Sequence, residues 1–165
     1  SCSNKEILMK EYYFPLAKYS APAQFKSEME QLGIHRYIYA IIDTQELLKW
    51  GLGKGDRIPR QVEGMEGWTH KFNGFAAKQL RKELVENRLD IVRNDITICV
   101  RDYTDEFNER WDAYGKEFAE AFLSNRERDA ILAEKRRPLL NKQVPKKRNE
   151  KPSTVVNTNL FEFST

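Results

Sequence analysis

Glycine and basic residues are concentrated in residues 51–67 of the sequence. This segment holds five glycines together with Lys54, Arg57 and Arg60. Lysine and arginine side chains bind and neutralise anions, and loops that connect rigid elements often carry binding or catalytic groups. The glycines alone could serve only to permit turns. We therefore expect a loop here that carries a functional site.

A second basic cluster lies near the end of the sequence. Residues 135–151 contain one acidic residue, Glu150, and eight basic ones: Lys135, Arg136, Arg137, Lys142, Lys146, Lys147, Arg148 and Lys151. Such a run attracts a polyanion, and the usual reason is neutralisation of nucleic-acid phosphates. A solvated tail that only aids solubility is the alternative. Residues 143–165 are predicted to be a flexible basic tail. Its mostly apolar residues 160–163, Leu-Phe-Glu-Phe, are a candidate contact for a protein partner.

The composition is that of a folded domain with a heavily solvated surface. The chain has 165 residues, of which 40% are hydrophobic and 32% charged, and its formal net charge is +3. No apolar run approaches the ~18 residues that span a bilayer, and the first residues lack the order of a signal peptide. Cys2 and Cys99 fit a loose thiol and a buried one better than a disulfide. We expect one domain in an intracellular, reducing compartment, without a membrane partner.

Hydrophobic periodicity predicts the elements that position these groups. Residues 11–16 form an aromatic run interrupted by Pro15, which is typical of an edge strand or an extended arm. A helix that begins near Pro22 ends at Gly33. Residues 36–51 read as a hairpin and residues 95–100 as a third strand, because both runs are rich in β-branched and aromatic residues.

Helical patterns account for the rest of the domain. Apolar residues from Thr69 onward recur at helical spacing, with basic residues on the other faces. Thr104 can cap a helix and Ser124 can begin another; the first carries an aromatic stripe that should face the core, made of Phe107, Trp111, Tyr114, Phe118 and Phe122. The predicted fold is α+β, with a small three-stranded antiparallel sheet flanked by helices in residues 34–142, after an N-terminal arm and helix in residues 1–33.

Three short motifs in this order resemble the GIY-YIG nuclease family. Residues 37–41, Tyr-Ile-Tyr-Ala-Ile, look like the family's first motif. Residues 48–57 are similar to a second motif that runs into Gly-Lys-Gly-x-Arg, with Lys49 in place of its tyrosine and Gln61 in place of a following histidine. Residues 130–141 look like the family's last helix, which ends in Pro-x-x-Asn. The resemblance covers the chain from the first of these motifs to the last.

The resemblance implies hydrolysis of phosphodiester bonds with one Mg²⁺ ion. Tyr39 would position or deprotonate the attacking water, and Arg57 would neutralise the phosphate. A carboxylate on the last helix would hold the metal, and this is Glu127 by its spacing to the apolar pair that follows, or Asp129 by its distance from the final asparagine. The basic side chains expected to contact nucleic acid are Lys49, Lys54, Arg60, His70 and Lys71.

Each of these residues also has a plainer interpretation. Tyr39 fits a packing residue of the hairpin, and Arg57 fits a solvated loop charge. Glu127 fits a capping box with Ser124, and Asp129 fits a first-turn charge that interacts with the helix dipole. The order of the motifs is therefore stronger evidence than any one residue.

Three functions follow as hypotheses. The first is a metal-dependent endonuclease that hydrolyses DNA, with double-stranded DNA as the expected partner. The alternative is a GIY-YIG-like module that has lost cleavage and binds nucleic acid or protein. The third is a protein–protein adaptor, which the mostly apolar residues 160–163 suggest.

Overall fold

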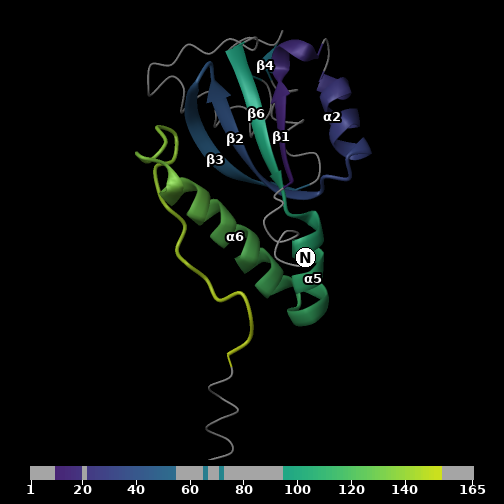
Figure 1. Ribbon diagram of the computed structural model, residues 1–165, viewed down its shortest axis with the longest axis vertical. Coiled ribbons are helices and arrows are strands. Elements are labelled where there is room, and N and C mark those ends of the chain that lie inside the picture. Colours follow the sequence, from purple (N-terminus) through teal and green to yellow (C-terminus); the bar gives the residue numbers. More distant parts are fainter. Residues whose placement is uncertain (1–9, 20–21, 55–64, 67–70, 73–94, 154–165) are drawn as a thin grey trace, which may run out of the picture.

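Four strands of the chain form one antiparallel sheet (Figure 1). The computed structural model describes residues 10–19, 22–54, 65–66, 71–72 and 95–153. The strands lie in the order β1 (Lys10–Pro15), β6 (Ile96–Asp102), β2 (Arg36–Asp43) and β3 (Glu46–Lys54). β2 is a central strand, because it pairs with β3 on one side and with β6 on the other. The predicted hairpin, third strand and α+β class are confirmed.

The predicted number of strands, three, is corrected to four by β1. This strand pairs with β6 along its whole length, from Lys10 opposite Asp102 to Pro15 opposite Thr97. It is an edge strand, where a proline without a backbone N–H is tolerated. The aromatic run near the start of the sequence is thus an edge strand and not a free arm.

The region between β3 and β6 departs from the prediction where the structure describes it. β3 continues to Lys54, so the first glycines of the expected loop belong to a strand. β4 (Met65–Glu66) pairs with β5 (Lys71–Phe72) in a separate two-stranded sheet. β5 falls where the helix from Thr69 was expected, and the rest of that helix lies outside the described residues.

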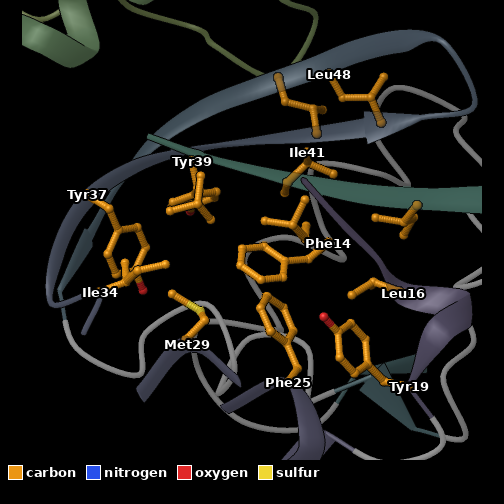
Figure 2. Close-up of a cluster of buried hydrophobic side chains, with 14 residues drawn as sticks. Phe14, Leu16, Tyr19, Phe25, Met29, Ile34, Tyr37, Tyr39, Ile41 and Leu48 are labelled. Atoms are coloured by element: carbon orange, nitrogen blue, oxygen red, sulfur yellow. The ribbon is translucent and has the colours of Figure 1, made fainter. Parts of the chain in front are cut away.

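The two faces of the main sheet carry separate apolar clusters, because side chains alternate along a strand. One face presents Tyr37, Tyr39 and Ile41 of β2, which pack with the helix α2 (Pro22–Gln31). Figure 2 shows these side chains pointing toward Phe25 and Met29 of that helix. The helix ends as predicted at Gly33, whose φ of 71° lies in the left-handed region that glycine adopts readily.

The opposite face packs against two helices that follow β6. Its cluster includes Ile38 and Ala40 of β2, Trp50 of β3 and Cys99 of β6. The helices are α5 (Thr104–Tyr114) and α6 (Lys116–Ala133), which pack against each other and against β2. Within the described residues no helix is long and apolar enough to cross a membrane.

The aromatic stripe of the second half of the chain is only partly buried. The chain breaks its helical path at Gly115, with φ at 95°, so α5 and α6 are separate helices. Phe107 and Phe122 are buried as expected, whereas Trp111 and Tyr114 are 41% and 44% exposed. The expectation of a continuous core stripe is wrong because this break turns the second helix away from the axis of the first.

The expected beginnings of these helices are also corrected. Thr104 is the first residue of α5, and the side chain of Asp102 accepts its backbone N–H at 3.0 Å. The Thr104 hydroxyl donates to Asp102 at 2.6 Å and accepts the backbone N–H groups of His35 and Arg36. Ser124 lies inside α6 and begins no helix.

After α6 the chain forms a strap, here defined as residues 134–153, that runs back along α6 (Figure 1). Residues 143–153 were expected to belong to a flexible tail, and this expectation is corrected. They have no regular secondary structure, but side chains of α6 hold their backbone. Arg128 donates to the carbonyl of Pro145 at 2.7 Å, and Asn125 bonds both backbone groups of Arg148.

Candidate nucleic-acid interface

Tyr39, the expected catalytic tyrosine, lies on the central strand with its ring across β3. Tyr39 is only 3% exposed. A Cβ atom placed on Gly51 would lie 2.6 Å from Cζ and 2.7 Å from the hydroxyl oxygen of Tyr39. Tyr37 covers Gly53 in the same way, with a Cβ only 1.8 Å from its ring. These two glycines therefore make room for tyrosine rings, and they are not turn residues.

The second motif lies beside Tyr39 on the same face of the sheet. Lys49 pairs with Ile41 and Gly51 with Tyr39 in the hairpin register. Because paired residues of neighbouring strands project to the same side, Lys49 shares the α2 face with Tyr39. Lys54 is exposed at the end of the strand. The fold thus brings the first motif and the lysine of the second motif onto one face.

The expected metal ligands belong to α6, on the other face of the sheet. Glu127 is half-buried, and Asp129 is exposed with a carboxylate oxygen 3.3 Å from Nη2 of Arg126. Since α6 packs on the face of Ile38 and the face of Tyr39 belongs to α2, Tyr39 and Glu127 do not share one side of the sheet. The expected convergence of these two side chains is not met, because alternation along β2 separates them.

The plainer interpretations of the two carboxylates are corrected as well. Ser124 lies within α6, so Glu127 forms no capping box with it. Asp129 lies in the second half of α6 and not in its first turn. Among the residues described, no three His, Cys, Asp or Glu side chains are grouped closely enough to hold a metal ion.

The other expected site residues are placed incompletely. Arg57, Arg60 and His70 lie outside the described residues. Lys71 is placed by its backbone in β5. These predictions therefore stay predictions.

The last motif contacts the second one directly. Asn141 of the Pro-x-x-Asn end accepts the backbone N–H of Trp50 at 2.8 Å and donates to its carbonyl at 2.9 Å. The backbone N–H of Leu140 donates to the carbonyl of Leu48 at 2.9 Å. The side chain of Asn141 thus replaces a neighbouring strand at the outer edge of β3. The described parts of the three motifs are thus joined in one structural unit.

Trp50 is fixed from two further sides. Its indole N–H donates to Glu134 of the strap at 3.1 Å. The guanidinium carbon of Arg101 lies 4.5 Å from the centre of the indole ring, within the range of a cation–π interaction. This packing supports the first part of the strap against the sheet.

A second anchor holds the end of the strap, and sequence reasoning missed it. Asn125 of α6 is 2% exposed, accepts the N–H of Arg148 at 2.9 Å and donates to its carbonyl at 2.7 Å. Glu150, the single acidic residue of the basic run, pairs with Arg110 of α5 and Arg126 of α6, both at 3.1 Å. The isolated carboxylate in a basic run was the only sequence signal for this anchor.

The anchors leave the basic side chains of the strap in solvent. All eight basic residues between 135 and 151 are exposed, and within the described residues none of them forms an ion pair. Near the end of the strap, Arg110 and residues 147–153 line a cavity of about 570 Å³. The strap therefore presents exposed positive charges on a backbone that hydrogen bonds hold at Pro145 and Arg148. No protein family, curated protein or solved structure matches the chain.

Proposed function

We propose that this protein binds nucleic acid through the strap. The observation that carries the proposal is the fixed backbone of the strap beneath eight exposed basic side chains. A disordered basic tail must be ordered when it binds, which opposes binding. In this chain the ordering has already taken place during folding, so more of the phosphate attraction can appear as affinity.

The charges of the strap recognise the phosphodiester backbone, which duplexes and single strands share. Each neutralised phosphate releases counterions, so the logarithm of the binding constant falls with the logarithm of salt concentration by about 0.9 per contact for duplex DNA. Four contacts from the strap would give a slope of about −3.6. Double-stranded DNA, the partner expected from the sequence, is one of the nucleic acids that such charges would bind.

A double substitution tests the proposal. Lys146→Gln with Lys147→Gln should weaken binding to a DNA duplex and make the salt slope less negative by about 1.8, because two phosphate contacts are lost. The matched control is Lys10→Gln with Lys18→Gln, two exposed lysines outside the strap that each pair with a carboxylate, Asp105 and Glu28. Titrations at several salt concentrations measure both variants. Equal slopes for the strap variant and the wild-type protein would refute the role of the strap.

Metal-dependent cleavage of DNA is the second candidate. The order of the motifs, the ring of Tyr39 over Gly51, and the contact of Asn141 with the second motif support a GIY-YIG-like endonuclease. One Mg²⁺ held by Glu127 or Asp129 would supply the positive charge that stabilises the transition state. The placement of Tyr39 and Glu127 on opposite faces favours instead the module that binds without cleaving.

Incubation with supercoiled plasmid and Mg²⁺, with and without a chelator, separates the two candidates. If the protein is an endonuclease, Tyr39→Phe should abolish nicking while DNA binding persists, because it removes only the hydroxyl. Tyr12→Phe is the matched control, since Tyr12 packs against the same cluster. A wild-type protein that binds DNA and leaves the plasmid intact would establish the binding module.

The metal ligand is tested on α6. Glu127→Gln should abolish nicking with little loss of binding, because the amide keeps the shape and loses the anionic ligand. Asp129→Asn is the companion variant. Unchanged nicking by both variants would remove the metal from this helix.

A further inference from the structure

Two aromatic side chains are exposed at the end of α5. Trp111 lies 5.9 Å from Phe107 and Tyr114 lies 6.2 Å from Phe118, measured between ring centroids. Each exposed ring is therefore supported on one side by another aromatic side chain, while more than 40% of its residue surface remains in contact with water. Because residues three apart on a helix are neighbours, the two exposed rings lie side by side, and exposed apolar groups that are clustered mark candidate binding surfaces.

This pair lies next to the basic cavity at the end of the strap. Arg110 contributes to the cavity wall, and Tyr114 lies one helical turn further along the same side of α5. Arg110 itself is held in place, because its guanidinium carbon lies 4.8 Å from the ring of Phe122 and it pairs with Glu150. Glu150 also lines the cavity, and the remaining positive charge comes from Lys147, Arg148 and Lys151, which are exposed.

Rigid aromatic rings beside a positively charged cavity fit unpaired bases on a phosphate backbone. Aromatic side chains stack on bases of any sequence, and basic side chains neutralise the adjoining phosphates. A base-paired duplex hides the faces of its bases, so it can use the charge but not the rings. A protein partner would use the rings and would need to be acidic to match Lys147 and Lys151.

We propose that this surface binds single-stranded nucleic acid, or an unpaired stretch within a longer molecule. Bases stack on Trp111 and Tyr114, and phosphates contact Lys147 and Lys151 in the cavity. The inference rests on the proposed nucleic-acid binding and adds the strandedness of the ligand. It assigns α5 and the end of the strap to one continuous interface.

The test compares a labelled thymidine oligonucleotide of about 12 nucleotides with a duplex of the same length, by fluorescence anisotropy at fixed salt. We expect the single strand to bind the wild-type protein more tightly than the duplex. Trp111→Ala and Tyr114→Ala should each weaken single-strand binding by about tenfold, because each variant loses the ring on which a base stacks. Duplex binding should change less than twofold.

Two further variants show that stacking, and not exposure alone, is responsible. Trp111→Phe keeps a flat ring and should retain most of the single-strand affinity. Leu132→Ala removes an exposed apolar side chain from α6 and should change neither affinity. The variants alter exposed side chains, and circular dichroism and thermal unfolding confirm that each one is folded.

Three outcomes would overturn the inference. The first is equal or tighter binding of the duplex by the wild-type protein. The second is unchanged single-strand affinity in both alanine variants while Lys146→Gln with Lys147→Gln weakens binding; this result would keep the proposed function and leave the rings to a protein partner. The third is the absence of salt-dependent binding to either nucleic acid, in which case the proposed function fails together with the inference.

Discussion

Replacing Asn125 by alanine should release the end of the strap while the sheet stays folded. The side chain makes two hydrogen bonds with the backbone of Arg148, at 2.9 and 2.7 Å, and a third with a carboxylate oxygen of Glu150 at 2.8 Å. Alanine removes all three. It also favours the helix by up to ~0.7 kcal/mol relative to asparagine, so α6 itself is not weakened.

The size of the effect follows from the types of these bonds. A neutral hydrogen bond contributes about 1 kcal/mol net, and one to a charged group about 2 kcal/mol. The free energy that opposes local opening of the strap should therefore fall by about 4 kcal/mol. At about 1.4 kcal/mol per factor of ten, the open population should rise by two to three orders of magnitude, up to complete opening.

Limited proteolysis with trypsin measures this opening at the bond after Arg148. When opening and closing are fast relative to cleavage, the cleavage rate follows the open population. Asn125→Ala should be cut there much faster than the wild-type protein, and amide hydrogen exchange of residues 146–150 should accelerate in parallel. The control is Asn149→Ala, an exposed asparagine of the same segment, which should behave like the wild-type protein.

The same experiment can refute the anchoring role of Asn125. Unchanged cleavage and exchange in Asn125→Ala would show that the remaining contacts hold the strap without it. A fall in the global free energy of unfolding as large as the local effect would show that the strap and the sheet open as one unit. We expect the global change to be about 1 kcal/mol or less, because opening of a peripheral segment leaves most core packing intact.

Three further substitutions or conditions probe the fold. Gly53→Ala should lower the free energy of unfolding by about 3 kcal/mol or more in urea titrations, because its Cβ would lie 1.8 Å from the ring of Tyr37; a change under 1 kcal/mol would contradict this close approach. Thr104→Val should cost about 2–4 kcal/mol, since two backbone N–H groups and Asp102 lose their hydroxyl partner, whereas Thr104→Ser should be much milder. Burial raises the pKa of the Cys99 thiol to about 11, so iodoacetamide at pH 8 should modify Cys99 only after unfolding, as mass spectrometry can show. Because the folded protein keeps this proton above pH 9 and the unfolded chain loses it, the free energy of unfolding should fall between pH 9 and 11, and a flat profile would contradict the raised pKa.

Local patterns were sufficient for the strands and for the end of the first helix. Runs rich in β-branched and aromatic residues predicted the β2–β3 hairpin and β6, because such side chains favour strands. Pro15 left an edge strand or an extended arm as alternatives, of which the structure has the edge strand, and Gly33 marked the end of α2, since each residue restricts or permits backbone conformations by itself. These predictions depend on neighbours in the sequence, and they are confirmed.

Helical spacing did not predict the break at Gly115 between α5 and α6, because the aromatic pattern continues across it. The aromatic residues from Phe107 to Phe122 keep a helical period across Gly115, so their spacing gave no sign of two helices. How α5 packs against α6 leaves Trp111 and Tyr114 exposed, and the spacing of the residues does not specify this packing. For this reason the sequence did not indicate the surface that we propose for unpaired bases.

Which helix covers which face of the sheet was decided by the tertiary structure. Alternation along β2 predicts that Tyr37, Tyr39 and Ile41 share a face, and it contains no information about the helix opposite them. The connections place α2 on that face and α6, with Glu127, on the other. Similarity of motifs could therefore nominate Tyr39 and Glu127 but could not determine their relative position.

The strap shows the same division between sequence and structure. The excess of positive charge in residues 135–151 is evident from the sequence, because charge depends on composition alone. Whether that charge lies on a loose tail or on a fixed surface depends on partners distant in the chain. Asn125, Arg110 and Arg126 are all at least 23 residues from the groups they bond in the strap. Such contacts form only when the folded helices bring these side chains to the strap, so only the tertiary structure could reveal them.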